Sequence, residues 1–424
     1  MKSWTTFIVA GALSACASAP PLAQRELPED ARNHDSRMVI VAVHNRSTGE
    51  VRSGAGSTLR GYSSASAYTV SDQARRDLQK LADSYHLQKI SEWPIALLEM
   101  HCVVFEIPAE SNREALLSSL QSDPRVQLAQ PLQSFATQAD ARTDAHARAP
   151  SALLQMDIPG AQRRSMGAGV RVAVIDTGLD ASHPDLAGRV EIERNFVDAD
   201  AQQFRRDRHG TAVAGVIAAA NNSGVGLIGI APQAHLLALK ACWQLEAGTD
   251  AARCNSYTLA QALTMAIEMR AQIINLSLTG PADPLLGALT RRANAQGIVV
   301  VGPGIADGFP AAVPGVLGVI RTEAGATAPQ VLRAPGSDVF TLAPGGHYEY
   351  SSGDSIATAA ISGVTALLLA RQPALHGADV HRLLSEATDT VATQAGEQRV
   401  VNACKALDRL NHSSECLVTR SARN

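Results

Sequence analysis

The second half of the chain consists of short, continuously apolar segments that alternate with stretches of helical periodicity. A strand that is apolar at every position, rather than at every second one, must be covered on both faces. Strands of this kind that alternate with helices are typical of a parallel sheet between two helical layers. From residue 151 onward we therefore expect an α/β domain. Its expected strands are Val170–Ile175, Leu236–Leu239, Ile273–Leu278 and Ile298–Val301, and its expected helices are Ala212–Ala220, Leu259–Arg270 and Pro284–Ala295.

A smaller unit precedes this domain, between residues 36 and 135. Its segments follow the order strand, helix, strand, strand, helix, strand. That βαββαβ order is typical of ferredoxin-like α+β units. One helix is expected at Ser71–Tyr85 with Ser71 as its N-cap, and another at Ser111–Leu120, where Ser111 and Glu114 stand in capping-box register. The expected strands are Met38–Val43, Ile95–Met100, His101–Ile107 and Val126–Leu132.

The length and the charge of the chain limit what it can be. A chain of 424 residues, 46% of them hydrophobic, is long enough for a large core and a small accessory domain, which argues against wholesale disorder. The formal net charge of −3 favours neither nucleic acid nor an anionic membrane surface as a partner. The composition therefore indicates a folded protein without a nucleic-acid partner.

The N-terminus has the pattern of a secretion signal. Lys2 is followed by the apolar run Thr5–Leu13, which is too short to span a bilayer. The segment Leu13–Cys16 resembles the bacterial lipobox, in which the cysteine receives a lipid and becomes the mature N-terminus. Ordinary signal-peptidase cleavage after Ala23 is the alternative.

Both alternatives export the chain. With the lipobox, residues 1–15 form a signal peptide, Cys16 carries the lipid, and residues 16–35 form a tether. Contact with a membrane would then occur only through this lipid anchor. The expected location is the periplasm or the outer membrane, or the medium after processing.

A linker is expected between the two units. Residues 136–150 are rich in Ala, Asp, Arg and Thr and show no apolar period. Exposed segments of this kind are preferred sites of proteolysis. Processing in this linker would separate the small unit at 36–135 from the large domain at 151–424.

The cysteines suggest two local disulfides. Cys242 and Cys254 flank a polar loop, and Cys404 and Cys416 do the same near the C-terminus. In an oxidising compartment each pair could close its loop. A metal site is the weaker interpretation, because no Cys-x-x-Cys spacing occurs. Cys102 lies in an apolar strand pattern and is expected to be a buried free thiol.

Three short segments in a fixed order supply the parts of an activated serine nucleophile. Asp176 follows an apolar strand in Val-Ile-Asp-Thr-Gly, His209 opens a helix in His-Gly-Thr-Ala-Val-Ala-Gly, and Ser355 precedes an apolar helical run in Gly-Asp-Ser-Ile-Ala. A serine hydroxyl needs a base to take its proton, and that base needs an anion to fix its tautomer. Singly, each residue also fits a structural role, as a turn Asp, a core His or an N-cap Ser. Together they predict a catalytic triad.

The order Asp, His, Ser is that of the subtilisins. On these motifs, residues from about 151 to 403 resemble the subtilisin family of serine peptidases (peptidase S8), and Ile273–Leu278 resembles the substrate-binding strand of that family. The resemblance implies a three-layer α/β domain with a mostly parallel sheet. It also implies that Asp176 orients the base, that His209 is the general base and acid, and that Ser355 is the nucleophile.

The resemblance extends, at the level of pattern, to the small unit. Residues 38–132 resemble the inhibitory prosegments of the family, so we expect a zymogen whose prosegment is an intramolecular inhibitor of polypeptide hydrolysis. Ser277, Leu278 and Gly280 are expected to line the pocket for the residue before the scissile bond. Calcium is common in the family, but no acidic cluster here has suitable ligand spacing, and Asp283 is expected to be a solvated loop charge. No cofactor or metal site is identified.

Two departures from the family pattern concern the active site. Subtilisins carry an Asn whose side chain donates a hydrogen bond to the oxyanion, and the matching position here is Ile305 or Ala306, neither of which can donate. Asp354 also places a carboxylate beside the nucleophile. The sequence therefore predicts an exported serine endopeptidase with an atypical oxyanion hole. The alternative is a weak or inactive subtilisin-like pseudoprotease that acts as an envelope binding module.

Overall fold

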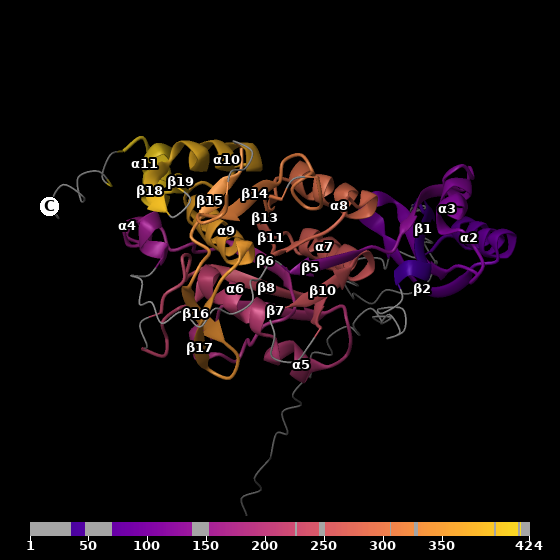
Figure 1. Ribbon diagram of the computed structural model, residues 1–424, viewed down its shortest axis with the longest axis horizontal. Coiled ribbons are helices and arrows are strands. Elements are labelled where there is room, and N and C mark those ends of the chain that lie inside the picture. The colour runs from indigo at the N-terminus through magenta and orange to yellow at the C-terminus, as the bar shows by residue number, and fades with distance from the viewer. Residues whose placement is uncertain are drawn as a thin grey trace, which may run out of the picture.

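The computed structural model shows an elongated molecule with a large α/β domain and a small α+β domain at one end (Figure 1). The structure describes residues 35–46, 70–137, 152–224, 227–245, 251–305, 307–325, 330–393, 396–413 and 416. The expected signal peptide, Cys16, almost all of the tether, most of the expected linker and Ala306 lie outside these residues.

Within the described residues, the large domain is organised around a sheet of seven strands in which every neighbouring pair is parallel. This confirms the expected α/β class with a mostly parallel sheet. In spatial order the strands are β15 (Leu332–Ala334), β14 (Leu317–Arg321), β13 (Val299–Pro303), β11 (Ile273–Leu276), β6 (Arg171–Asp176), β8 (His235–Lys240) and β7 (Val190–Asn195).

The central strand β6 shows why these strands are apolar throughout. Val172 and Val174 belong to one hydrophobic core, while Ala173 and Ile175 belong to another on the opposite face. Each face is therefore covered, and the residues from Val172 to Asp176 are all buried. The first core contains α6 (Arg208–Ala218), α9 (Asp354–Arg371), α10 (Gly377–Glu386) and α11 (Ala403–Asn411), and the second contains α7 (Ser256–Glu268) and α8 (Pro284–Ala295).

Helix α9 runs through the first core (Figure 1). Of the described helices it is the one long and apolar enough to cross a membrane, but most of it is buried inside the domain. Its residue Gly363 lies against Ile230, since a Cβ added there would come within 2.7 Å of the Ile230 Cβ. The apolar run after Ser355 is thus a buried core helix, and its packing fixes the position of its first turn, which contains Ser355.

The small domain has the expected βαββαβ order. Its described sheet is antiparallel in the order β2 (Gln88–Ile95), β3 (Met100–Glu106), β1 (Met38–His44) and β4 (Val126–Pro131), and its helices are α2 (Asp72–Tyr85) and α3 (Arg113–Gln121). Ser71 caps α2 as expected, its Oγ accepting from the Ala74 backbone N–H.

Two local expectations in this domain are wrong. Ile95–Met100 is not a strand, because Ala96–Leu98 form a 3₁₀ turn and Glu99 adopts a left-handed φ of 52° before β3 begins. The second strand instead is Gln88–Ile95, whose polar, half-buried residues lack the continuous apolar pattern. Helix α3 is capped by Asn112 rather than Ser111, since the Asn112 side chain accepts from the Ala115 N–H at 3.0 Å.

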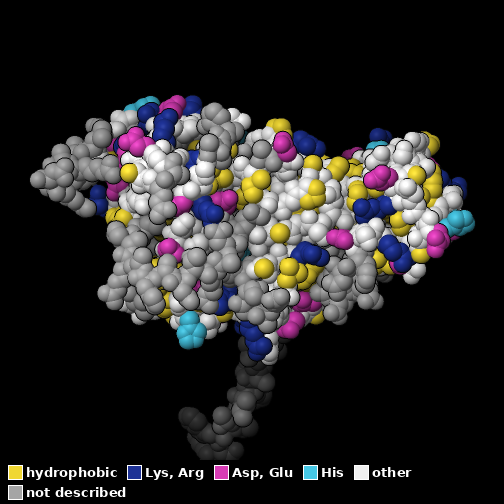
Figure 2. All heavy atoms as spheres, viewed as in Figure 1, with side chains coloured by type: hydrophobic (Ala, Val, Ile, Leu, Met, Phe, Trp, Pro, Cys, Tyr) yellow, Lys and Arg dark blue, Asp and Glu magenta, His cyan; other side chains and the backbone are white. Residues whose placement is uncertain are grey.

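The sheet of the small domain packs on the large domain. Alternate residues of β1 (Val39, Val41 and Val43) face α2 and α3, while Met38, Ile40 and Ala42 share a core with α7 and α8. Trp93 contributes to the same contact, edge-on to Tyr257 with ring centroids 4.7 Å apart. In the space-filling view the surfaces of the two domains are continuous (Figure 2).

A second described sheet joins β5, which follows the small domain in sequence, to three strands of the large domain. It contains β12 (Leu278–Thr279), β5 (Ser134–Thr137), β10 (Ala252–Asn255) and β9 (Cys242–Gln244), all antiparallel. Ala136 and Thr137, at the start of the expected linker, therefore belong to a strand. The expected strand Ile273–Leu278 is also divided, because β11 ends at Leu276 and β12 belongs to this second sheet.

The remaining described elements are short. They are η1 (Asp35–Arg37), η2 (Ala96–Leu98), η3 (Ala152–Met156), α4 (Ile158–Gln162), η4 (Pro184–Leu186), α5 (Ala201–Arg206), β16 (Val339–Ala343), β17 (His347–Ser351), β18 (Thr388–Thr393) and β19 (Gly396–Val401). Strands β16 and β17 form one hairpin, and β18 and β19 form another.

Both expected disulfides form among the described cysteines. Cys242 pairs with Cys254, and Cys404 pairs with Cys416, each across 12 residues of sequence. Cys102 is a free thiol, as expected, and it is fully buried. Burial raises the pKa of its thiol well above the ordinary range.

Replacing both Cys404 and Cys416 with Ala should lower the free energy of unfolding by about 2–4 kcal/mol. The disulfide closes a short loop and so restricts the unfolded chain. Urea denaturation measures the difference. The single variant Cys404→Ala removes the same cross-link and should lose a similar free energy of unfolding. A double variant as stable as the wild type would contradict the expectation.

Candidate active site

The structure places the three predicted triad residues at the ends of central elements. Asp176 is the last residue of β6, His209 is the second residue of α6, and Ser355 is the second residue of α9. All three are at most 2% exposed. Helices α6 and α9 pack against each other, so His209 and Ser355 occupy the first turns of two contacting helices. The carboxyl end of a central parallel strand is where sites of open α/β sheets are built.

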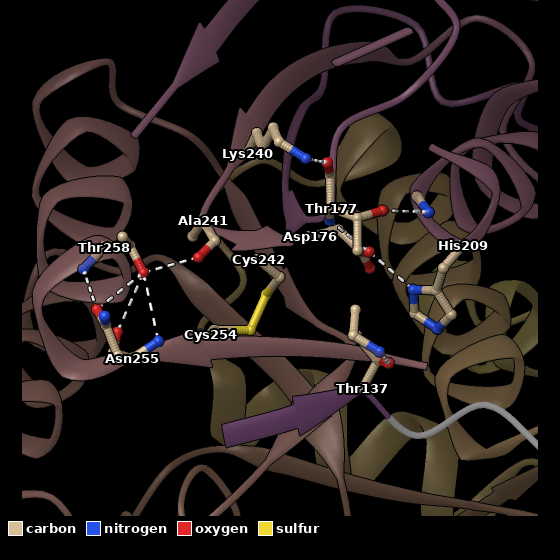
Figure 3. Close-up of a disulfide and its surroundings, with 12 residues drawn as sticks. Thr137, Asp176, Thr177, His209, Lys240, Ala241, Cys242, Cys254, Asn255 and Thr258 are labelled. Carbon is tan, nitrogen blue, oxygen red and sulfur yellow. Dashed lines mark hydrogen bonds and ion pairs between the residues drawn. A yellow bond between two sulfur atoms is a disulfide. The ribbon is translucent and has the colours of Figure 1, made fainter. Parts of the chain in front are cut away.

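Asp176 and His209 form a direct pair. The Nδ1 atom of His209 lies 2.7 Å from Oδ1 of Asp176, which also accepts the Thr177 backbone N–H at 2.7 Å (Figure 3). A carboxylate on Nδ1 fixes the tautomer that leaves Nε2 as the base. The pair therefore has the geometry of an oriented general base.

Two glycines allow this approach. Gly178 turns the chain after β6 with a φ of 111°, a conformation that favours glycine. A Cβ on Gly210 would lie 1.9 Å from the Gly178 carbonyl oxygen, so the backbone of α6 touches the loop that carries Asp176. Any larger residue at position 210 would push the histidine helix away.

The backbone of Ser355 is tied to the end of β11. The Ser277 hydroxyl donates to the Ser355 carbonyl at 3.4 Å, and the Asn275 Nδ2 donates to the Ser277 Oγ at 2.8 Å. The Ser362 hydroxyl donates to the Asn275 Oδ1 at 2.8 Å. All of these side chains are buried, so the network fixes the first two turns of α9. The roles of Asn275 and Ser362 were not expected; a buried Asn in an apolar strand was the available signal.

The two residues that depart from the family pattern, Asp354 and Ile305, lie as follows. The Asp354 Oδ1 accepts the Arg321 backbone N–H at 2.9 Å, which directs its carboxylate to β14. Ile305 follows β13, is 43% exposed, and offers no side-chain donor.

The chain's own strand β5 lies between β12 and β10, and the place that it fills between these two strands is called the groove below. Thr137 pairs with Leu278, and Ala136 pairs with Thr279 on one side and with Arg253 on the other. Figure 3 shows Thr137 lying beside the Asp176–His209 pair.

The expected substrate-binding residues line the same groove. Leu278 is a strand partner of β5, and Ser277 precedes it at the Ser355 carbonyl. A Cβ on Gly280 would come within 2.3 Å of the Phe135 ring, so this glycine makes room for an aromatic side chain. Phe135 is buried against Phe309, edge-on with centroids 5.7 Å apart. Phe309 was not expected from the sequence.

A buried ion pair joins the segments that carry Asp176 and His209. The Lys240 Nζ lies 2.5 Å from Oδ2 of Asp207. It also donates to the Thr177 carbonyl (Figure 3). Asp207 is two residues before His209, and Thr177 directly follows Asp176. Burial raises the pKa of Asp207 to about 6, while Lys240 acts in the opposite direction. This ion pair was not identified from the sequence, although a lysine at the end of the apolar strand β8 was visible there.

No group of three or more His, Cys, Asp or Glu side chains that could hold a metal ion occurs among the described residues. The expectation for Asp283 was wrong: it is not a solvated loop charge but is buried as the N-cap of α8. Its Oδ2 accepts from Gln130 at 2.8 Å and from Ser256 at 2.6 Å. Burial raises the pKa of this carboxyl group. Asp283 therefore belongs to the contact between the domains.

Replacing Lys240 with Met should lower the free energy of unfolding by about 3–5 kcal/mol, because it leaves the Asp207 carboxylate buried without its counter-charge. Urea denaturation at pH 7 measures this loss. The double variant Lys240→Met/Asp207→Asn should recover most of it, since no buried charge remains. An equal loss in both variants would show that the packing of Lys240, and not its charge, is what matters.

Comparisons with known proteins agree with this geometry. A model of the subtilase family (peptidase S8) matches residues 167–307 and 311–404, more than half of the chain. An intracellular serine protease of Paenibacillus polymyxa is 35% identical over 243 residues, which are 52% of this chain and 72% of that protein. A thermostable alkaline protease of Halalkalibacterium halodurans is 31% identical over 326 residues, which are 73% of this chain and 82% of that protein.

Among solved structures, fervidolysin from Fervidobacterium pennivorans is similar with a TM-score of 0.65 and 19% identity, over 88% of this chain and 60% of that one. At this identity the similarity shows the fold. The family match and the two proteases show more: the chain belongs to the subtilase family of serine endopeptidases.

Proposed function

We propose that this serine endopeptidase works through Asp176, His209 and Ser355 and is made as a zymogen inhibited by its own N-terminal domain. The observation that carries the catalytic part is the buried 2.7 Å contact between His209 and Asp176, on a helix that packs against the helix of Ser355. This arrangement supplies an oriented base in the same core as the hydroxyl.

In the proposed reaction, the Ser355 Oγ attacks the carbonyl carbon of the peptide bond while the His209 Nε2 takes the hydroxyl proton. The tetrahedral intermediate collapses when the imidazolium gives that proton to the leaving amine. Water then attacks the acyl-enzyme by the same route and releases the acid. Asp176 stabilises the imidazolium and remains ionised throughout.

The oxyanion would be bound by backbone N–H groups. The Ser355 N–H lies in the first turn of α9, where helix N–H groups have no intrahelical acceptor. Ile305 adds no side-chain donor, and loss of such a donor in a subtilisin costs about 10²–10³ in turnover. We therefore propose a slow peptidase whose rate depends strongly on how well the peptide is held.

The prosegment role rests on where β5 lies. An extended segment between β12 and β10 has the backbone pairing that a peptide substrate would use. Its register carries the chain toward Ser277 and Ser355, so we propose that the bond cut in maturation lies one or two residues after Thr137. The aromatic pocket at Phe135, with Gly280 and Phe309 as walls, favours substrates with a large apolar residue at that position.

We also propose that the chain is exported and that Cys16 carries a lipid, with a periplasmic or outer-membrane location before processing. The lipobox-like sequence at residues 13–16 supports this, and so do the two disulfides among the described residues, because disulfides persist in oxidising compartments. Metabolic labelling with a tritiated fatty acid should mark the wild type and not Cys16→Ala. Calcium binding is a family property for which the described residues offer no cluster.

The full chain with Ser355→Ala should remain uncut, whereas the wild type should release a fragment whose new N-terminus is residue 139 or 140. The alanine lacks the nucleophile but leaves β5 in the groove. Mass spectrometry of the purified products locates the cut, and a fluorophosphonate probe should label the wild type alone.

A control keeps the result interpretable. Added mature wild-type enzyme should cut the Ser355→Ala precursor in trans, which shows that the variant is folded and cleavable. A wild type that is folded, uncut and unlabelled would contradict the peptidase proposal. It would favour the alternative of a binding module, which the apolar Ile305 motivates.

A further inference from the structure

We infer that the Cys242–Cys254 disulfide is a determinant of extended-peptide binding, because it holds β10 as the outer wall of the peptide groove. The inference rests on the proposed function in one respect: strand β5 is taken to occupy the place of a substrate. It assigns to these two cysteines a positioning role, which differs from the general stabilising role of a disulfide.

The disulfide lies directly beside the peptide strand. Cys254 is the register partner of Phe135 in β5 on one side and of Cys242 in β9 on the other. Both cysteines are fully buried, and their Cα atoms are 4.2 Å apart. The cross-link therefore joins β10 to β9 at the level of Phe135. Thr137, two residues after Phe135, lies beside the Asp176–His209 pair in Figure 3.

Strand β10 needs support when the groove is empty. The pairings of β10 in the second sheet are with β5 and β9, and β12 pairs there with β5. Once β5 leaves, β10 and β9 remain as a ribbon with three register pairs. Two-stranded ribbons of this length are marginally stable in water at best. A covalent bond across the ribbon keeps its edge available for the next peptide.

The Cys242 end of the bond is anchored to the catalytic strand. The Ala241 backbone N–H donates to the Asp176 carbonyl at 2.9 Å, and the Ala241 carbonyl accepts from the Thr258 hydroxyl at 2.7 Å. Thr258 belongs to the capping box of α7, whose N-cap Asn255 directly follows Cys254. The disulfide adds a covalent link between Cys242, next to Ala241, and Cys254 in β10. The position of β10 is therefore set relative to Asp176 (Figure 3).

The expected consequence is preorganisation of the groove. With the bond, the edge of β10 is already in place and a peptide loses less free energy in ordering it. Without the bond, each binding event must also order β9 and β10. The effect should grow with the number of peptide residues that pair with β10 and vanish for ligands that touch Ser355 alone.

The chain provides a matched control. Cys404–Cys416 spans the same 12 residues and is also buried, but Cys404 lies in α11 and packs in the core on the other face of the sheet. Removing it should lower stability to a comparable extent, and it contacts neither β5 nor β10. A difference between the two pairs therefore reports position rather than overall stability.

The first test uses the full chain with Ser355→Ala, so that β5 stays in place and catalysis is not required. Hydrogen exchange of β5 and β10 amides is followed by mass spectrometry in three backgrounds: both disulfides present, Cys242→Ala/Cys254→Ala, and Cys404→Ala/Cys416→Ala. We expect exchange in β5 and β10 to speed up by at least about tenfold when Cys242–Cys254 is removed, relative to exchange in β6. With Cys404–Cys416 removed, these strands should exchange within about twofold of the parent. Unchanged β5 exchange in the first variant, or equal acceleration in both, would overturn the inference.

The second test uses processed enzyme with Ser355 intact. Removing Cys242–Cys254 should raise KM for a peptide that extends four residues before the scissile bond by about tenfold, and leave kcat/KM for a single-residue ester within about twofold. Equal effects on both substrates would overturn the inference. If neither substrate is turned over by the wild type, the proposed function fails, while the exchange experiment still decides the role of the disulfide.

Discussion

The close approach between the loop after β6 and the first turn of α6 is the constraint on which the candidate site depends. It requires Gly210 to rest on the Gly178 carbonyl, which brings Nδ1 of His209 within 2.7 Å of Asp176. The buried Lys240 joins the same two segments through its contacts with Asp207 and the Thr177 carbonyl. Backbone contact and buried charge thus support the catalytic pair from two directions.

The proposed peptide-binding site is the place of one strand in a sheet rather than a separate cavity. Strands β12 and β10 have edges that β5 fills, and the pairing uses backbone groups that any extended peptide carries. Selectivity must then come from side-chain positions such as the one that holds Phe135 between Gly280 and Phe309. Under the proposed function, the same strand edges would bind both β5 as an inhibitor and an extended substrate.

Much of this architecture could be predicted from local patterns. Continuous apolar runs marked four of the strands in the main sheet. Asp176 directly follows one of these runs, whereas His209 and Ser355 were marked by short motifs that open helical stretches. Features set by distant parts of the chain could not be predicted. The run Ile273–Leu278 does not show that the chain leaves one sheet at Ser277 to enter another, since both parts are apolar. Asp283 is polar in sequence, yet the small domain buries it by supplying Gln130, which lies more than 150 residues away.

The small domain is bound to the large domain by the pairing of β5 and by the packing of its own sheet, and these two contacts contribute different free energies. Strand β5 contributes few backbone hydrogen bonds, each worth about 0.5–1.5 kcal/mol net. The sheet of the small domain (β2, β3, β1 and β4) contributes the burial of Met38, Ile40, Trp93 and their neighbours against α7 and α8. Fully burying one large apolar side chain is worth about 1.5–3 kcal/mol. Cutting the chain after β5 would leave both sets of contacts intact. Under the proposed inhibition, release of β5 would therefore depend more on loss of the packed sheet face than on loss of the β5 pairing.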